Sequence, residues 1–189
     1  MDGIELNKIP LHTLRKRVTA IPQDTLTLPG TIRQNLMPWL LNEENPTEAH
    51  QVASPTVRKV LADTMVGGLI GNAGGSDTSM EEFGMSAGEK QLFNVARSIL
   101  LQKWYEARVV LMEEVSSNLD PEADDRLQWA IGEAFRGLTT CSIAHRTETL
   151  ERVKAIYTLD ECTVSLAGED GDPSDAFDRP ITVDSNGNE

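Results

Sequence analysis

The sequence has few cysteines, few basic residues and no long apolar run, and each shortage excludes a class of protein. With 2 cysteines in 189 residues, neither a disulfide framework nor a metal-ligand spacing is present, which indicates a reducing compartment. Lys and Arg number 17 against 30 Asp and Glu, a net charge of −13, which argues against a nucleic-acid partner. No run approaches the roughly 20 apolar residues of a transmembrane helix, and the acidic start is unlike a signal peptide. We therefore expect a soluble, cytoplasmic chain.

The length predicts one domain with a sizeable core. We place this domain at residues 1–168. Residues 169–189 are acidic and rich in Gly, Asp, Ser and Pro, a composition that is typical of a disordered tail.

The segment Arg108–Asp120 carries the strongest local pattern. Its apolar run Val109–Met112 predicts a strand buried on both faces of a parallel sheet. Glu113 and Glu114 end this strand, and the carboxyl ends of parallel strands are where ligands bind in open α/β sheets. Two carboxylates there suit Mg²⁺ and the polarisation of an attacking water. The alternative is a strand that simply ends in a polar loop.

A helix is predicted to follow, with Asp120 as N-cap and Pro121 at its first position. Its apolar residues recur at helical spacing at Leu127, Ala130, Ile131, Ala134 and Phe135.

Two more strands are predicted at Val18–Ile21 and Thr139–Ala144, and each is followed by a polar residue of interest. Gln23 follows the first strand and His145 follows the second. Read alone, Gln23 is an ordinary turn residue and His145 a structural or exposed histidine. Shorter patterns predict a strand at Ile4–Leu6, helical turns at Pro10–Arg17 and a hairpin of Ala155–Asp160 with Thr163–Leu166.

Residues 37–80 are predicted to form a mostly helical insert, including a helix that runs from a Thr47 cap toward Leu61. The glycine-rich residues 67–77 invite comparison with a phosphate-binding loop. No Gly-Lys-Ser/Thr follows them, however, so the lysine that meets the β- and γ-phosphates is missing. We predict a flexible linker there instead.

The segment Met85–Gln91 is predicted to begin a long helix. Ser86 and Glu89 have the spacing of a capping box, and the helix then has one apolar face made of Leu92, Val95, Ala96, Ile99 and Leu100. A helix N-terminus with a free hydroxyl and a nearby glycine, here Gly88, can also receive a phosphate. Plain helix capping is the alternative.

In order and spacing, these segments resemble the motifs of ATP-binding-cassette (ABC) ATPases. Gln23 matches the Q-loop glutamine, Ser86–Gln91 the signature motif, Glu113–Asp120 the Walker B and D-loop region, and His145 the switch histidine. The resemblance covers about residues 2–168 and is most like the C-terminal nucleotide-binding domains of exporters in the multidrug-resistance-associated group. It implies an α/β, P-loop NTPase-like sheet with a helical subdomain at about residues 37–101.

The resemblance also implies ATP and Mg²⁺ as cofactors and gives roles to the residues at the strand ends. Glu114 would polarise the attacking water, and His145 would contact the γ-phosphate. Glu113 and Gln23 would serve Mg²⁺. At position 113 the family has Asp, and the extra methylene of Glu113 moves the carboxylate by more than about 1 Å.

The remaining matched residues would face a partner. Ser86, Gly88 and Asp120 would contact ATP held by a second nucleotide-binding domain in a head-to-tail dimer, and the domain would act with transporter membrane domains, at the cytoplasmic face of the membrane. Ala87 and Glu89 depart from the family's Gly and Gln. A carboxylate at position 89 would repel a phosphate unless the capping box draws it away.

The family's Gly-x-x-x-x-Gly-Lys-Ser/Thr loop is missing from this sequence, and that loop supplies most of the nucleotide affinity. We expect a domain cut before its Q-loop strand, inactive alone. The alternatives are a non-catalytic interaction module that binds a partner ATPase or transporter, and a truncated gene product.

Overall fold

The computed structural model describes residues 3–42, 54–113, 115, 119–143, 155–160 and 163–169. The chain divides into two compact units, Met1–Ile143 and Ala144–Glu189, which are described separately. Among the described residues, no helix has both the length and the apolar character needed to cross a membrane.

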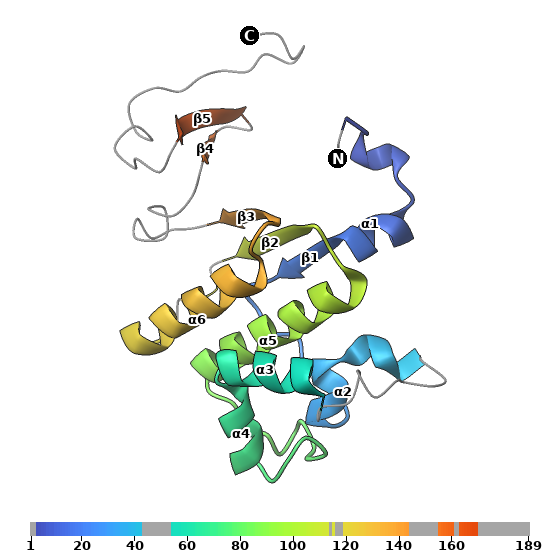
Figure 1. Ribbon diagram of the computed structural model, residues 1–189, viewed down its shortest axis with the longest axis vertical. Coiled ribbons are helices and arrows are strands. Elements are labelled where there is room, and N and C mark those ends of the chain that lie inside the picture. Colours follow the sequence, from blue (N-terminus) through green and yellow to red (C-terminus); the bar gives the residue numbers. More distant parts are fainter. Residues whose placement is uncertain are drawn as a thin grey trace. The chain divides into compact units, whose positions relative to one another are not determined.

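Three parallel strands form the sheet of the first unit, in the order β1–β2–β3 (Figure 1). They are β1 (Val18–Ile21), β2 (Val109–Glu113) and β3 (Thr139–Ile143). In the register of the sheet, Ile21 pairs with Met112, and Glu113 pairs with Ile143. The three carboxyl ends therefore meet at one edge, as predicted for a parallel α/β sheet.

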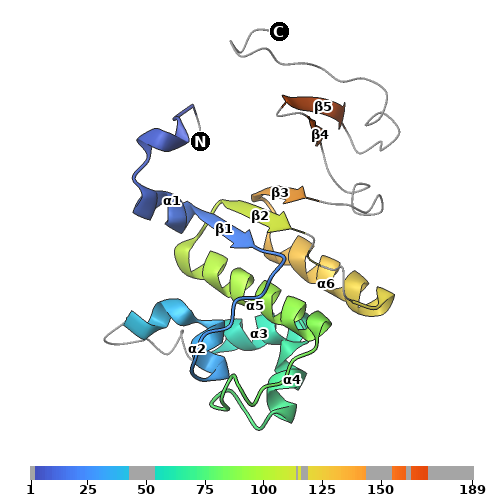
Figure 2. The ribbon, with the colours of Figure 1, turned by 180° about the vertical axis from the view of Figure 1, so that it is seen from behind.

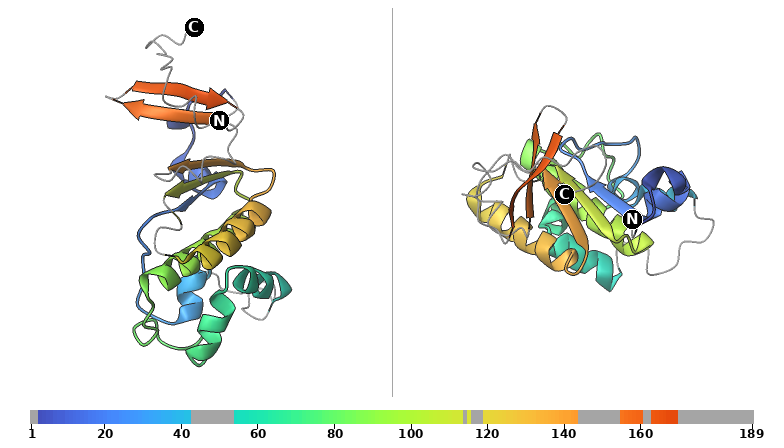
Figure 3. Two further views of the ribbon diagram at one scale, coloured as in Figure 1. Left: turned by 90° about the vertical axis from the view of Figure 1, so that its left-hand side faces the viewer. Right: turned by 90° about the horizontal axis from the view of Figure 1, so that it is seen from above.

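The helices of the first unit are arranged around α5. They are α1 (Leu11–Arg17), α2 (Ile32–Leu36), α3 (Pro55–Asp63), α4 (Val66–Asn72), α5 (Ala87–Tyr105) and α6 (Pro121–Ala134), with 3₁₀ turns η1 (Leu6–Lys8) and η2 (Pro38–Asn42). Helix α5 contacts β1 and also α2, α3, α4 and α6. Figures 1 and 2 show α5 and α6 next to the sheet, with α2, α3 and α4 beyond them, and the side view in Figure 3 shows the same layers.

The core of this unit is built on the apolar face of α5. The residues predicted for that face are all buried: Leu92, Val95, Ala96, Ile99 and Leu100. Phe93 is fully buried beside them and meets the ring of Phe83 edge-on, with 6.3 Å between the ring centroids. Burying each large apolar side chain contributes about 1.5–3 kcal/mol, so the apolar face of α5 contributes substantially to stability.

Within the described residues of the first unit, the sheet is covered on one face only, which corrects the prediction of a strand buried on both faces. Val110 is fully buried, whereas its neighbour Leu111 is 44% exposed and Ile143 is 56% exposed. Successive side chains of a strand point to opposite faces, and the register of β2 with β3 puts Leu111 and Ile143 on the same face. All five residues of β3 are exposed.

Two local predictions are wrong. Residues predicted as a strand at Ile4–Leu6 lead instead into η1, which begins at Leu6. The linker predicted at the glycine-rich residues 67–77 is wrong for residues 67–72, because Gly67 and Gly68 lie inside α4, which ends at Asn72. Burial of Val66 and Ile70 at 0% and 6% exposure outweighs the low helix propensity of glycine.

Helix α3 begins later than predicted. Ser54 is its N-cap, accepting a hydrogen bond from the Val57 N–H, and Pro55 is in its first turn. Thr47, predicted as the cap, lies outside the described residues.

The second unit contains the predicted hairpin. Strands β4 (Ala155–Asp160) and β5 (Thr163–Glu169) pair antiparallel. Strand β5 includes Glu169, the first residue assigned to the predicted tail. Residues 170–189 lie outside the described residues.

Candidate functional site

The carboxyl edge of the sheet carries both predicted Mg²⁺ ligands, Glu113 and Gln23. Glu113 is the last residue of β2, and Gln23 follows β1 after one proline. Because β1 and β2 are adjacent and parallel, both residues leave the sheet at the same edge, and both are exposed. A carboxylate and an amide oxygen are hard ligands of the kind that Mg²⁺ takes, so this donor set fits the predicted ion.

Two further predicted residues, Glu114 and His145, lie outside the described residues. Among the described residues, no group of three or more His, Cys, Asp and Glu side chains gathers in a way that could hold a metal ion. The Mg²⁺ site and the catalytic roles of Glu114 and His145 therefore stay predictions.

The predicted capping box at the start of α5 is confirmed. Ser86 Oγ accepts a hydrogen bond from the Glu89 N–H at 3.3 Å, and Glu89 Oε2 accepts one from the Ser86 N–H at 2.8 Å. Gly88 lies half-buried in the same first turn. The Glu89 carboxylate thus holds its negative charge at the helix end that attracts anions, where it would compete with any phosphate.

Asp120 is the N-cap of α6, as predicted. Its Oδ1 accepts a hydrogen bond from the Ala123 N–H at 3.0 Å, and Pro121 occupies the first turn. Asp120 is exposed and begins a different helix from the one capped by Ser86. Its predicted role toward a partner domain remains a prediction.

The segment that carries Gln23 is joined to α5 by a line of polar side chains. Asn94 Nδ2 donates to Pro22 O at 2.7 Å, and Ser98 Oγ donates to Ala20 O at 3.2 Å. The sequence patterns considered above did not indicate this role. The signal was nevertheless present: polar residues at positions 94, 97 and 98 interrupt an otherwise apolar stretch of helix with i, i+3, i+4 spacing.

Arg97 adds two hydrogen bonds to this group of contacts. Its Nη1 donates to Leu26 O at 2.6 Å and its Nε to Asn35 O at 2.7 Å. The guanidinium also lies over the ring of Phe93, 5.2 Å from the centroid. Burial lowers the pKa of Arg97, because desolvation disfavours the charged form.

Asn35, in α2, also fixes the loop between β1 and α2, through hydrogen bonds of its side chain to the loop backbone. The Leu28 N–H donates to Asn35 Oδ1 at 2.7 Å, while Asn35 Nδ2 donates to Leu28 O at 2.8 Å and to Thr31 O at 3.1 Å. The side chain is fully buried. A buried amide that is satisfied in this way holds the backbone in one conformation.

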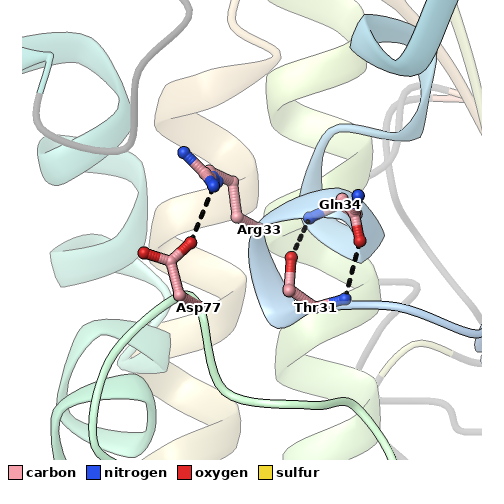
Figure 4. A network of polar contacts seen from close by, with 4 residues as sticks. All are labelled: Thr31, Arg33, Gln34 and Asp77. Atoms are coloured by element: carbon pink, nitrogen blue, oxygen red, sulfur yellow. Dashed lines mark hydrogen bonds and ion pairs between the residues drawn. The ribbon is translucent and has the colours of Figure 1, made fainter.

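The start of α2 is joined to the loop that precedes α5. Figure 4 shows the capping box of Thr31 with Gln34 and the ion pair of Arg33 with Asp77, at 2.7 Å. Both charged side chains are more than half exposed, so the pair contributes less than about 1 kcal/mol. Backbone hydrogen bonds reinforce the junction, from Ile32 N to Thr78 O and from Met80 N to Gly30 O.

No family model matches the chain, but curated relatives match nearly all of it. ABC multidrug transporter B of Aspergillus fumigatus is 32% identical over 173 residues, covering 92% of this chain. An ABC-type transporter of Gibberella zeae is 32% identical over 183 residues, covering 97% of the chain. ATP-binding cassette sub-family C member 4 of Mus musculus is 33% identical over 162 residues, covering 85%. The chain spans 11%, 12% and 11% of the length of these relatives, respectively.

Proposed function

Because this chain belongs to the ABC transporter family, as a segment similar to members of subfamily C, we propose that it forms part of a nucleotide-binding domain that couples ATP hydrolysis to membrane transport. One observation carries the proposal. Gln23 and Glu113 leave adjacent parallel strands at one edge of the sheet, and the Gln23 segment is bonded to the helix that Ser86 caps.

The roles of the residues follow from their chemistry. The oxygens of Glu113 and Gln23 would hold Mg²⁺, which when bound neutralises charge on the phosphates. Glu114 would accept the proton of the attacking water, as a general base positioned next to the metal ligands. His145 would donate a hydrogen bond to a phosphate oxygen.

A partner domain would use the N-terminal end of α5, which Ser86 caps. The Ser86 hydroxyl and the first-turn N–H groups near Gly88 would meet the ATP held by a second nucleotide-binding domain, together with Asp120. The Glu89 carboxylate bound at the Ser86 N–H would weaken that contact. Because a weakened contact disfavours hydrolysis, the same observation favours a second candidate function, a non-catalytic module. It would lend Ser86–Gln91 and the Asp120 loop to another ATPase, or bind a transporter through the Gln23 region.

A fusion protein tests the proposed function. We join to this chain the phosphate loop of a curated relative together with the strand before it and the helix after it, and we call the product the completed domain. We expect it to show slow, Mg²⁺-dependent ATP hydrolysis whose rate rises steeply with protein concentration, because the composite site needs a dimer. The rate of phosphate release measures this hydrolysis. The chain alone is the control, and calorimetry should show Mg·ATP binding weaker than about 1 mM. A completed, folded chain that binds Mg·ATP without hydrolysing it would favour the interaction module.

The extra methylene of Glu113 leads to a further prediction. In the completed domain, Glu113→Asp should raise turnover several-fold, because Mg²⁺ demands nearly ideal octahedral geometry that the longer side chain disturbs. Steady-state hydrolysis at saturating Mg·ATP measures the effect. Glu122→Asp, an exposed acid in the first turn of α6, should change nothing, and an unchanged or lower rate for Glu113→Asp would contradict the assignment.

A further inference from the structure

We infer that Arg97 and Asn94 are positioning residues that clamp the backbone of residues 22–28 onto α5. The loop residue Gln23 is thereby held against the same helix that Ser86 caps. The clamp itself is independent of any activity. Only its consequence for Gln23 and Ser86 rests on the proposed function.

The contacts are spaced along successive turns of α5. Thr25 Oγ1 donates to Lys90 O at 2.9 Å, one turn after the Ser86 cap. Asn94 reaches Pro22 O one turn later, and Arg97 reaches Leu26 O after that. Gln23 therefore lies between two backbone carbonyls, those of Pro22 and Leu26, that are both held by α5.

Apolar burial does not hold this segment in place. Residues 22–28 form neither helix nor strand, and the side chains of Leu26 and Leu28 are 66% and 37% exposed. Because the hydrophobic effect scales with the area removed from water, these leucines anchor the segment weakly. Polar bonds to its carbonyls are then the main force that fixes its position.

Arginine is suited to this task and lysine is not. One planar guanidinium donates to two carbonyls from different parts of the chain, Leu26 O and Asn35 O, and hydrogen bonds from a charged donor are roughly twice as strong as neutral ones. A lysine ammonium is a point charge on a flexible stem and does not reproduce the fork. Within the described part of the chain, Arg97 Nη2 is buried without a hydrogen-bond partner, so the hydrogen bonds of the guanidinium go to these two backbone carbonyls, with the Phe93 ring beside it.

Hydrogen exchange and proteolysis of the full chain test the clamp. In Arg97→Lys we expect the Leu28 amide, which donates to Asn35 Oδ1, to exchange about tenfold faster or more, and chymotrypsin to cut after Leu26 at a similarly raised rate, since both require local opening. Exchange within α5, at Leu92 to Leu100, should not change. Arg136→Lys, on an arginine exposed beyond α6, is the matched control and should leave all these rates unchanged.

A double-mutant cycle separates positioning from a purely structural role. Thr25→Val should speed opening of residues 22–28 in the natural background and have little further effect in Arg97→Lys, because the released segment has already left α5. Additive effects, or faster exchange throughout α5 and the segment together, would overturn the inference, as would unchanged opening of the segment. If Arg97→Lys does not fold, Asn94→Ala with Thr25→Val supplies the same cycle. None of these measurements uses ATP, so failure of the clamp and failure of the proposed ATPase function are seen separately.

Discussion

Turnover by the completed domain is expected to fall roughly 100-fold or more when Glu114 is replaced by Gln, the scale of losing a general base. The amide keeps the size and shape of the carboxylate but cannot accept the proton of the attacking water. Mg·ATP binding should therefore survive the change. Phosphate release and nucleotide titration on the same preparation measure the two quantities.

Another acidic residue, Glu122, supplies the control for this experiment. Glu122→Gln removes a charge from the exposed first turn of α6 and should leave turnover within about twofold, because a surface charge is screened by salt. If Glu114→Gln and Glu122→Gln hydrolyse ATP equally fast, Glu114 is not the base, and the catalytic assignment fails.

Stability should depend most strongly, among the polar side chains, on Asn35. We expect Asn35→Ala to lower the free energy of unfolding by about 2–3 kcal/mol, because the backbone N–H and C=O of Leu28 both lose the buried side chain that pairs them. Urea unfolding followed by tryptophan fluorescence measures the change.

A second asparagine gives the matched control. Asn72 is exposed at the end of α4, so Asn72→Ala should alter stability by less than about 0.5 kcal/mol. Equally small effects of the two substitutions on the free energy of unfolding would show that the hydrogen bonds of Asn35 do not contribute to stability as expected. A full loss of cooperative unfolding in Asn35→Ala would place the loop before α2 within the folding core.

Structural features that depend on residues close together in the sequence were predictable. The caps at Ser86 and Asp120, the start of α6 at Pro121 and the apolar face of α5 all depend on spacings of three or four residues. Such spacings are set by helix geometry itself. The strand at Val109 and its parallel partners followed from apolar runs that end in polar residues.

Features that depend on distant partners were not predictable in the same way. The bond from Arg97 to Leu26 O joins residues 71 positions apart, and the bond from Asn94 to Pro22 O spans 72. No local spacing encodes an acceptor that is a backbone carbonyl, because every residue has one. The helix at Gly67–Gly68 was likewise missed, because burial of Val66 and Ile70 overrides local propensity.

The exposed apolar residues on the sheet of the first unit have a consequence for how the isolated polypeptide behaves. Strand β3 is an edge strand of its sheet in the described part of the chain, and Leu111 of β2 and Ile143 of β3 are exposed on the same face of that sheet. An edge strand with apolar neighbours is a template for pairing with other chains. The net charge of −13 opposes such encounters at low ionic strength, and salt screens that repulsion. Self-association of this chain should therefore increase with added salt, the opposite of what a charge-driven complex would do.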